Sequence, residues 1–252
     1  MSALVLALAA GAVVGLALGA LGGGGGVLAV PALIYLLGFA PSDAATASLV
    51  IVTVTSATAL YGHARDGWVR WRAGALFAAA GAGPAALAGV LADGVPRRVL
   101  TAAFAAVAVL AALRMLRGAP AEGAELPVRP VRATAAGAAL GGVTGFLGVG
   151  GGFLAVPALV GVVGLRMRAA VGTSLLVITV NALTALVARA GTATALDWSV
   201  VAPFTGAAIL AAWDGRRLAA RVEPSALRRV FGAVLLAVAA LMAADTLFVF
   251  RA

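Results

Sequence analysis

Cysteine and lysine are absent from this chain of 252 residues, and histidine occurs once, as His63. Without cysteine the chain has no disulfide, no thiolate nucleophile and no Cys-ligated metal site. One histidine, together with carboxylates that fall near the ends of apolar runs, does not supply the nucleophile, base and metal ligands of a catalytic centre. We therefore expect neither an enzyme nor a protein that holds a cofactor or a metal.

Charged residues are also scarce, at 11% of the chain against 63% hydrophobic residues. A soluble domain of this size could not bury so much apolar surface, so the composition predicts an all-α protein that crosses a membrane several times. The 18 basic residues are all arginine and give a net charge of +9. They are spread over the short segments between apolar runs, which indicates a role in membrane orientation rather than in binding nucleic acid.

Ten apolar segments are candidates for membrane crossing, which takes about 17 to 25 residues. We expect eight full spans and two short segments, 27–39 and 153–165, that are either re-entrant or completed by extended chain. A stretch rich in proline and charge at 117–132 separates an N-terminal transmembrane repeat, 1–116, from a C-terminal one, 133–252. The predicted segments are 3–20, 27–39, 44–61, 71–91, 99–116, 133–147, 153–165, 169–188, 198–213 and 227–250.

The two repeats share a pattern of 23 residues at 11–33 and 137–159. The copies read GAVVGLALGALGGGGGVLAVPAL and GAALGGVTGFLGVGGGFLAVPAL, and 15 of the 23 positions are identical. Each copy has glycine at every fourth position of an apolar helix, then a run made mostly of glycine, then a short apolar segment with Pro31 or Pro157. We interpret each copy as a broken membrane helix.

The positions of the arginines distinguish two topologies. If the two short segments do not cross the membrane, each half has four crossings, the repeats are parallel, and the arginines divide nine to nine between the sides. If they do cross, each half has five crossings, the repeats are inverted, and fourteen arginines face four. Because arginine is enriched on the cytoplasmic side of membrane proteins, we favour inverted repeats with both termini outside.

The glycine runs would place backbone N–H and C=O groups inside the membrane without helical partners. Each such group costs several kcal/mol unless protein, water or a ligand satisfies it. The free N–H groups and the helix dipole at the start of the segment after each run would favour a bound anion. The candidate binding residues in the runs are Gly22, Gly23, Gly24, Gly25, Gly26, Gly148, Gly150, Gly151 and Gly152.

Hydroxyl and amide groups on the helices that follow the glycine segments are the other candidate ligands. They donate hydrogen bonds to an oxyanion without adding charge, although Ser and Thr also join membrane helices to one another. Asn181 is the one asparagine of the chain, and it stands mid-helix, opposite Thr55 in the repeat. With Asn181 we select Ser48, Thr173 and Ser174 from a group that also contains Thr46, Thr53, Thr55, Ser56, Thr58, Thr179 and Thr184. Thr144, one residue before Gly145, is a further candidate to face the second break.

Other prominent residues have structural explanations. Glycine at four-residue spacing lets membrane helices pack closely, which accounts for Gly11, Gly15, Gly19, Gly137, Gly141 and Gly145. We expect His63 to be a solvated loop residue beside Arg65 and Asp66, and the four tryptophans, Trp68, Trp71, Trp198 and Trp213, to be anchors at the membrane interface. No charged residue or histidine stands near the middle of a predicted span, so the sequence contains no visible proton relay.

At these motifs the chain resembles the TauE/SafE family of membrane permeases, also called the sulfite exporter or 4-toluene sulfonate uptake family. The resemblance lies in the duplicated glycine pattern at 11–33 and 137–159, in Thr173-Ser174-Leu175, and in the closing Leu-Arg-Arg-Val-Phe-Gly at 227–232. It implies a secondary transporter of the prokaryotic plasma membrane that moves sulfite, organosulfonates or related sulfur anions. The first half departs from the second by having Ala47 where the second has Thr173.

Together these observations predict a carrier whose anion sits between the two breaks, held by backbone N–H groups and by Ser48, Ser174 and Asn181. Alternating access would come from one half rocking against the other. Carboxylates or phosphonates are alternative cargos, and a membrane scaffold that transports nothing is an alternative of another class. The expected partners are a small anion and the lipid bilayer, with no nucleic acid, and the Gly- and Ala-rich faces would permit a homodimer.

Overall fold

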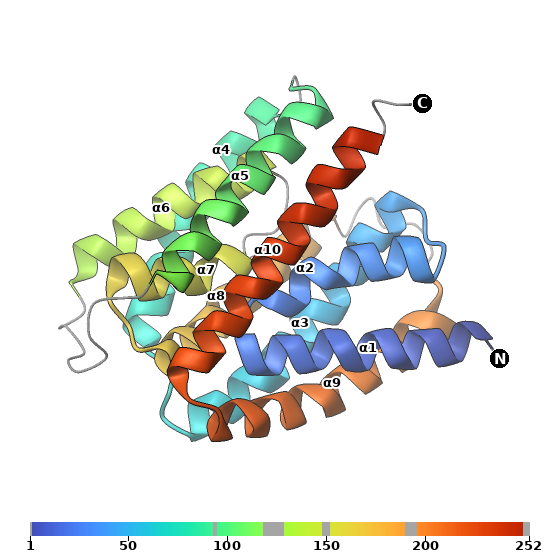
Figure 1. Ribbon diagram of the computed structural model, residues 1–252, viewed down its shortest axis with the longest axis horizontal. Helices are drawn as coiled ribbons and strands as arrows, with labels where there is room; N and C mark the ends of the chain where they lie inside the picture. Colours follow the sequence, from blue (N-terminus) through green and yellow to red (C-terminus); the bar gives the residue numbers. More distant parts are fainter. Residues whose placement is uncertain (1, 93–94, 118–128, 148–151, 190–195, 249–252) are drawn as a thin grey trace.

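The structure is a computed structural model, and it describes residues 2–92, 95–117, 129–147, 152–189 and 196–248 (Figure 1). These residues form α-helices and two short π-helical segments, so the predicted all-α architecture is confirmed. The first half contains α1 (Ser2–Leu21), α2 (Gly24–Pro31), η1 (Ala32–Leu36), α3 (Pro41–Arg65), α4 (Trp71–Ala92) and α5 (Arg97–Leu116). The second half contains α6 (Pro130–Leu147), α7 (Gly152–Ala158), η2 (Leu159–Val163), α8 (Met167–Arg189), α9 (Trp198–Arg221) and α10 (Pro224–Phe248).

The outer faces of the bundle are apolar, as a bilayer requires. Tyr35, Leu87, Leu91, Leu210 and Leu241 are each at least 70% exposed, which no soluble bundle would sustain over so many helices. Four of the described helical stretches are long and apolar enough to cross a membrane: Ala3–Leu21, Ser42–Arg65, Met167–Val187 and Pro224–Leu241. The structure therefore fits a polytopic membrane protein.

The two halves are interleaved rather than merely placed side by side. The first helix of each half packs on the fourth α-helix of the other half, so α1 lies against α9 and α6 lies against α4. The remaining helices pair with their counterparts in the repeat, α3 with α8, α5 with α10 and α2 with α7. Figure 1 shows α1 and α9 side by side along the lower edge of the molecule, with α4 and α6 at the opposite edge.

Glycines at four-residue spacing make the α1–α9 and α4–α6 contacts possible. A Cβ added to these glycines would meet backbone atoms of the neighbouring helix well inside van der Waals distance. Both helices of each pair advance in step, which makes the pairs parallel: Gly11 meets Phe204, Gly15 meets Ala208, Gly19 meets Ala212, Gly137 meets Phe77 and Gly141 meets Gly81. The packing explanation is thus confirmed for these five glycines, while the surroundings of Gly145 are not described.

The short segment after each break changes its winding at a proline. Pro31 ends α2 and Pro157 lies in α7, and a π-helical turn follows each one, since proline removes a helical hydrogen bond. Both π segments are followed by a left-handed glycine, Gly38 with φ of 72° and Gly164 with φ of 81°. These two glycines stand at the same offset as the duplicated motif, so the structural repeat continues to the end of the short segments.

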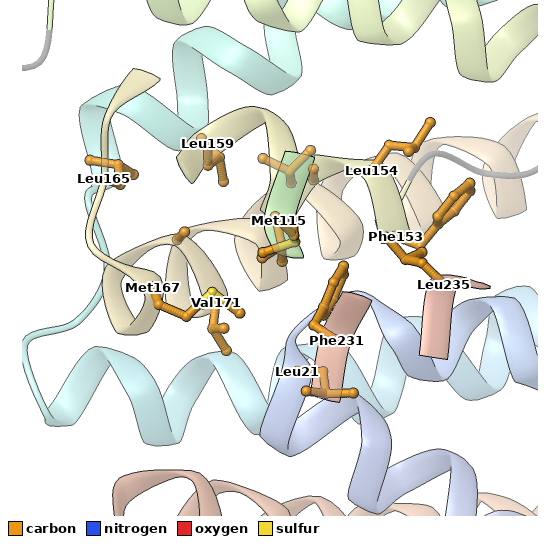
Figure 2. Close-up of a cluster of buried hydrophobic side chains, with 14 of the residues drawn as sticks. Leu21, Met115, Phe153, Leu154, Leu159, Leu165, Met167, Val171, Phe231 and Leu235 are labelled. Carbon is orange, nitrogen blue, oxygen red and sulfur yellow. The ribbon is translucent and has the colours of Figure 1, made fainter. Parts of the chain in front are cut away.

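A buried apolar cluster surrounds the place where the breaks meet. Leu21 from α1, Phe153 from α7, and Phe231 and Leu235 from α10 all belong to it (Figure 2). Phe153 and Phe231 are each only 1% exposed. This cluster fixes the ends of α1 and α7 relative to one another and so positions the glycine backbone of both breaks.

Candidate functional site

The first break is narrower than the sequence predicted. Gly22 ends α1 by donating its N–H to the Leu18 carbonyl at 2.9 Å and turns the chain with a φ of 75°, a conformation that favours glycine. Gly23 is the N-cap of α2, and Gly24 is already helical. Only Gly22 and Gly23 are therefore outside helices, and the first-turn N–H groups of α2, which have no helical acceptor, belong to Gly24, Gly25 and Gly26.

The two breaks touch through their backbones. A Cβ on Gly23 would lie 2.5 Å from the Gly152 carbonyl oxygen and 2.8 Å from Cα of Phe153. Gly152 is the first residue of α7, so α2 and α7 begin at the same place in the molecule. Gly148, Gly150 and Gly151 lie outside the described residues. The predicted convergence of the two glycine motifs is thus seen for Gly23 and Gly152.

Ser174 is the side chain that the structure brings to the break. It is fully buried, its Oγ would lie 2.6 Å from a Cβ on Gly22, and it donates to the Val171 carbonyl at 2.8 Å. That bond stays within α8, and the hydroxyl oxygen can still accept or re-aim toward a ligand. Ile178 lies one turn further along α8 and covers Gly152.

The other selected side chains are not gathered at the break. Thr173 accepts a hydrogen bond from the backbone N–H of Arg70 at 3.0 Å, so it holds the start of α4 instead. Ser48 donates to the Ala45 carbonyl of its own helix at 2.8 Å. Asn181 is half-buried two turns beyond Ser174, which places both on the same face of α8, and no described residue bonds its amide.

A second group of hydroxyls lies between α3 and α8, formed by residues that the sequence analysis named but did not select. Thr179 donates to Ser56 at 2.9 Å, which joins the two helices. The hydroxyls of Thr53 and Thr55 are buried without a partner among the described residues. Unpaired hydroxyls in a membrane helix point to water or a polar ligand. The sequence does show four hydroxyl residues within the six positions 53–58 of an apolar run. It does not show which neighbouring helix these hydroxyls face.

The expectation for His63 is wrong. His63 belongs to the last turn of α3 and is only 6% exposed, because α1 packs over it. Its Nε2 faces the Gly19 carbonyl oxygen at 3.3 Å, one turn before the break. Sequence reasoning missed this contact because Gly19 and His63 lie 44 positions apart in the chain.

Comparison with known proteins agrees with the architecture. The family model described as sulfite exporter TauE/SafE matches residues 7–242. Two curated relatives from Xylella fastidiosa, strains 9a5c and Temecula1 (ATCC 700964), are 37% and 36% identical over 245 residues, which is 94% of this chain and 93% of each relative. Both are described as probable membrane transporter proteins, and no solved structure matches the chain. With its match spanning nearly the whole sequence, the chain belongs to the sulfite exporter TauE/SafE family of membrane transporters.

Proposed function

We propose that the protein is a secondary transporter for a small anion, with sulfite, an organosulfonate or a related sulfur anion as the cargo, in the inner membrane of a prokaryote. The observation that carries this proposal is the meeting of the two breaks, where Gly23 lies against Gly152 and Ser174 lies against Gly22. Backbone N–H groups at the start of α2 offer donors and the positive end of a helix dipole without a fixed charge. An anion held in this way can also be released, as a carrier requires.

Inverted repeats are part of the proposal, and helix directions support them. α3 and α8 are antiparallel, because Ser56 meets Thr179 while His63, further along α3, meets Gly172, which comes earlier on α8. The ends of α1 and α3 lie together, since Gly19 meets His63. The chain between them, α2 and η1, therefore returns to the end at which α1 began. This path supports five crossings in the first half, and the antiparallel packing of α3 on its counterpart α8 supports an inverted second half.

The moving units of the transport cycle would not be the two sequence halves. α1 is locked to α9 and α6 to α4 by contacts in which the glycines leave no spare space. Separating the halves would break both contacts, whereas moving α1 with α9 against α4 with α6 would keep them. We therefore assign alternating access to these mixed pairs, with the breaks on the boundary between them.

Uptake of radiolabelled sulfite into proteoliposomes tests the proposal. Gly23→Ala should abolish uptake, because its Cβ would enter the Gly152 backbone. Ser174→Ala should reduce uptake by roughly 10- to 100-fold, since a hydrogen bond to a charged group contributes about 1.5 to 3 kcal/mol. Competition with taurine, sulfate, acetate and methylphosphonate then separates sulfur anions from carboxylates and phosphonates.

Gly83→Ala is the matched control, because Gly83 also lies in an apolar helix but a Cβ there meets nothing within 4 Å. Every variant is first shown to elute from size exclusion as the wild type does. Wild-type uptake by both Gly23→Ala and Ser174→Ala would place the cargo path elsewhere and contradict the proposal.

A further inference from the structure

A small pocket lies beside the first break, on the side where α1, α3 and α9 end. Its volume is about 30 Å³, and its polar lining consists of His63, Asp66, Trp68, Arg168 and Arg216. Ala20 and Val171 form the wall toward the break, and a Cβ on Gly22 would lie 2.9 Å from the Val171 carbonyl oxygen. The pocket is therefore next to the proposed anion path but is built from other residues.

Both arginines are held in fixed positions by partners in and around the pocket. Arg216 pairs with Asp66 through Nη1, donates to the Gly62 carbonyl at 3.4 Å and stacks on Trp213, whose ring centre is 5.1 Å away. Arg168 donates through Nη2 to the carbonyls of Ala220 and Val222, and its guanidinium lies 5.7 Å from the centre of the Trp68 ring. Trp68 and Trp213, expected to be membrane anchors, thus support these cations.

Three nitrogen atoms of this group are buried without a partner. They are Nδ1 of His63, Nε of Arg168 and Nε of Arg216, half of the atoms of this kind among the described residues. A buried polar atom left unpaired costs about 1 to 3 kcal/mol, whether it is a donor or an acceptor, so three such atoms around one pocket call for a ligand. Since Asp66 is the one carboxylate of the pocket and is paired with Arg216, the charges of Arg168, Arg216 and Asp66 leave an excess of one positive charge.

We propose that this pocket binds one small oxyanion together with one proton on His63. The Gly19 carbonyl can only accept, so Nε2 of His63 carries the hydrogen and Nδ1 of the neutral ring presents a lone pair. A lone pair repels an anion, whereas protonated Nδ1 donates to it. The charged groups that line the pocket with His63 are Arg216 from α9, Arg168 from α8 and Asp66, which follows α3. The two arginines oppose a proton on His63 until an anion is bound, so we expect the proton and the anion to bind as a pair.

The size of the pocket restricts the ligand. A volume of about 30 Å³ exceeds what one water needs but leaves no room for an aromatic ring. Together with the guanidinium groups of Arg168 and Arg216 in its lining, this size favours a small inorganic oxyanion such as sulfate over an arylsulfonate. Among the described residues, no glycine of the breaks lines this pocket. Its His63 contacts the Gly19 carbonyl, which lies one helical turn before the first break.

Calorimetric titration of the purified full-length protein with sulfate tests the proposal, because sulfate itself stays ionised throughout the range used. We expect wild type to bind sulfate at least tenfold more tightly at about pH 5.5 than at about pH 8, with uptake of one proton per anion measured from buffers of different ionisation enthalpy. His63→Gln keeps a donor for Gly19 and should remove both the pH dependence and the proton uptake. Arg168→Met should weaken binding at least tenfold, and Arg168→Lys should restore part of it.

Arg217→Met is the control, since Arg217 is an exposed arginine of α9 whose ion-pair partner among the described residues is Asp214 on its own helix. It should bind as wild type does. Gly23→Ala should keep the pH-dependent sulfate site even though it loses sulfite uptake, so failure of the glycine-break proposal is separable from failure of this one. No sulfate binding by wild type, or unchanged binding and pH dependence in both His63→Gln and Arg168→Met, would overturn the proposal.

Discussion

At the scale of single residues, Gly15 shows how little room the helix contacts leave. A Cβ on Gly15 would enter the Ala208 backbone, whereas a Cβ on Gly206, on the outer face of α9, meets nothing within 4 Å. We predict that Gly15→Ala lowers stability by about 1 to 3 kcal/mol, the usual cost of overpacking. Gly206→Ala should leave stability unchanged or raise it by up to about 1 kcal/mol, because alanine suits a helix better than glycine. Thermal unfolding in detergent measures both, and equal melting temperatures would contradict the contact.

Residue roles were predictable where spacing along the chain encodes them. The four-residue spacing of Gly11, Gly15 and Gly19 indicated a packing face, and the structure confirms it. The roles of His63 and Thr173 were not predictable, because each is set by a partner far away in sequence, the Gly19 carbonyl and the Arg70 N–H. Helix periodicity places a residue on a face but does not say which helix covers that face.

At the scale of helices, the bond between Thr179 and Ser56 joins α8 to α3 across the centre of the bundle. We predict that Thr179→Val and Ser56→Ala each lower the free energy of unfolding. The double variant should lose less than the sum of the two single losses. The expected coupling is about 0.6 kcal/mol, the average for hydrogen bonds between membrane helices. A double-mutant cycle in mild denaturing detergent measures it. Thr184→Val is the control, since Thr184 is exposed and, within the described part of the chain, donates to the Val180 carbonyl of its own helix. Strict additivity would show that this bond does not contribute to the α3–α8 contact.

The apolar runs predicted every helix, and the duplication predicted which helices correspond. The extent of the break was not predictable, because a glycine run carries no side-chain pattern that marks where a helix resumes. Gly24, Gly25 and Gly26 are the first residues of α2, which continues to Pro31. In this break, only Gly22, with its left-handed backbone, and the N-cap residue Gly23 lie outside the helices. The interleaving of the halves could not be predicted either. The glycine faces of α1 and α6 indicate that another helix packs closely on each, but they do not identify that helix.

At the scale of the whole molecule, the absence of native cysteine gives a clean test of topology. Single cysteines at Ala40, Arg72, Ser199 and Arg217 probe four exposed positions. Inverted repeats predict that Ala40→Cys and Ser199→Cys react with a membrane-impermeant maleimide from the outside, and that Arg72→Cys and Arg217→Cys react only after permeabilisation. Parallel repeats would instead put positions 40 and 199 on opposite sides, so that result would contradict the inverted arrangement.

The pairing of α1 with α9 has a consequence for how the protein is made. Gly11 and Phe204 are in contact but lie 193 positions apart, so α1 is complete long before its partner exists. At a synthesis rate of about 5 to 20 residues per second, that delay lasts about 10 to 40 s. Throughout that time the glycine face of α1 and the backbone of the first break lack their final neighbours. The nascent chain must therefore shelter both at the insertion machinery or in lipid until translation reaches the ninth helix.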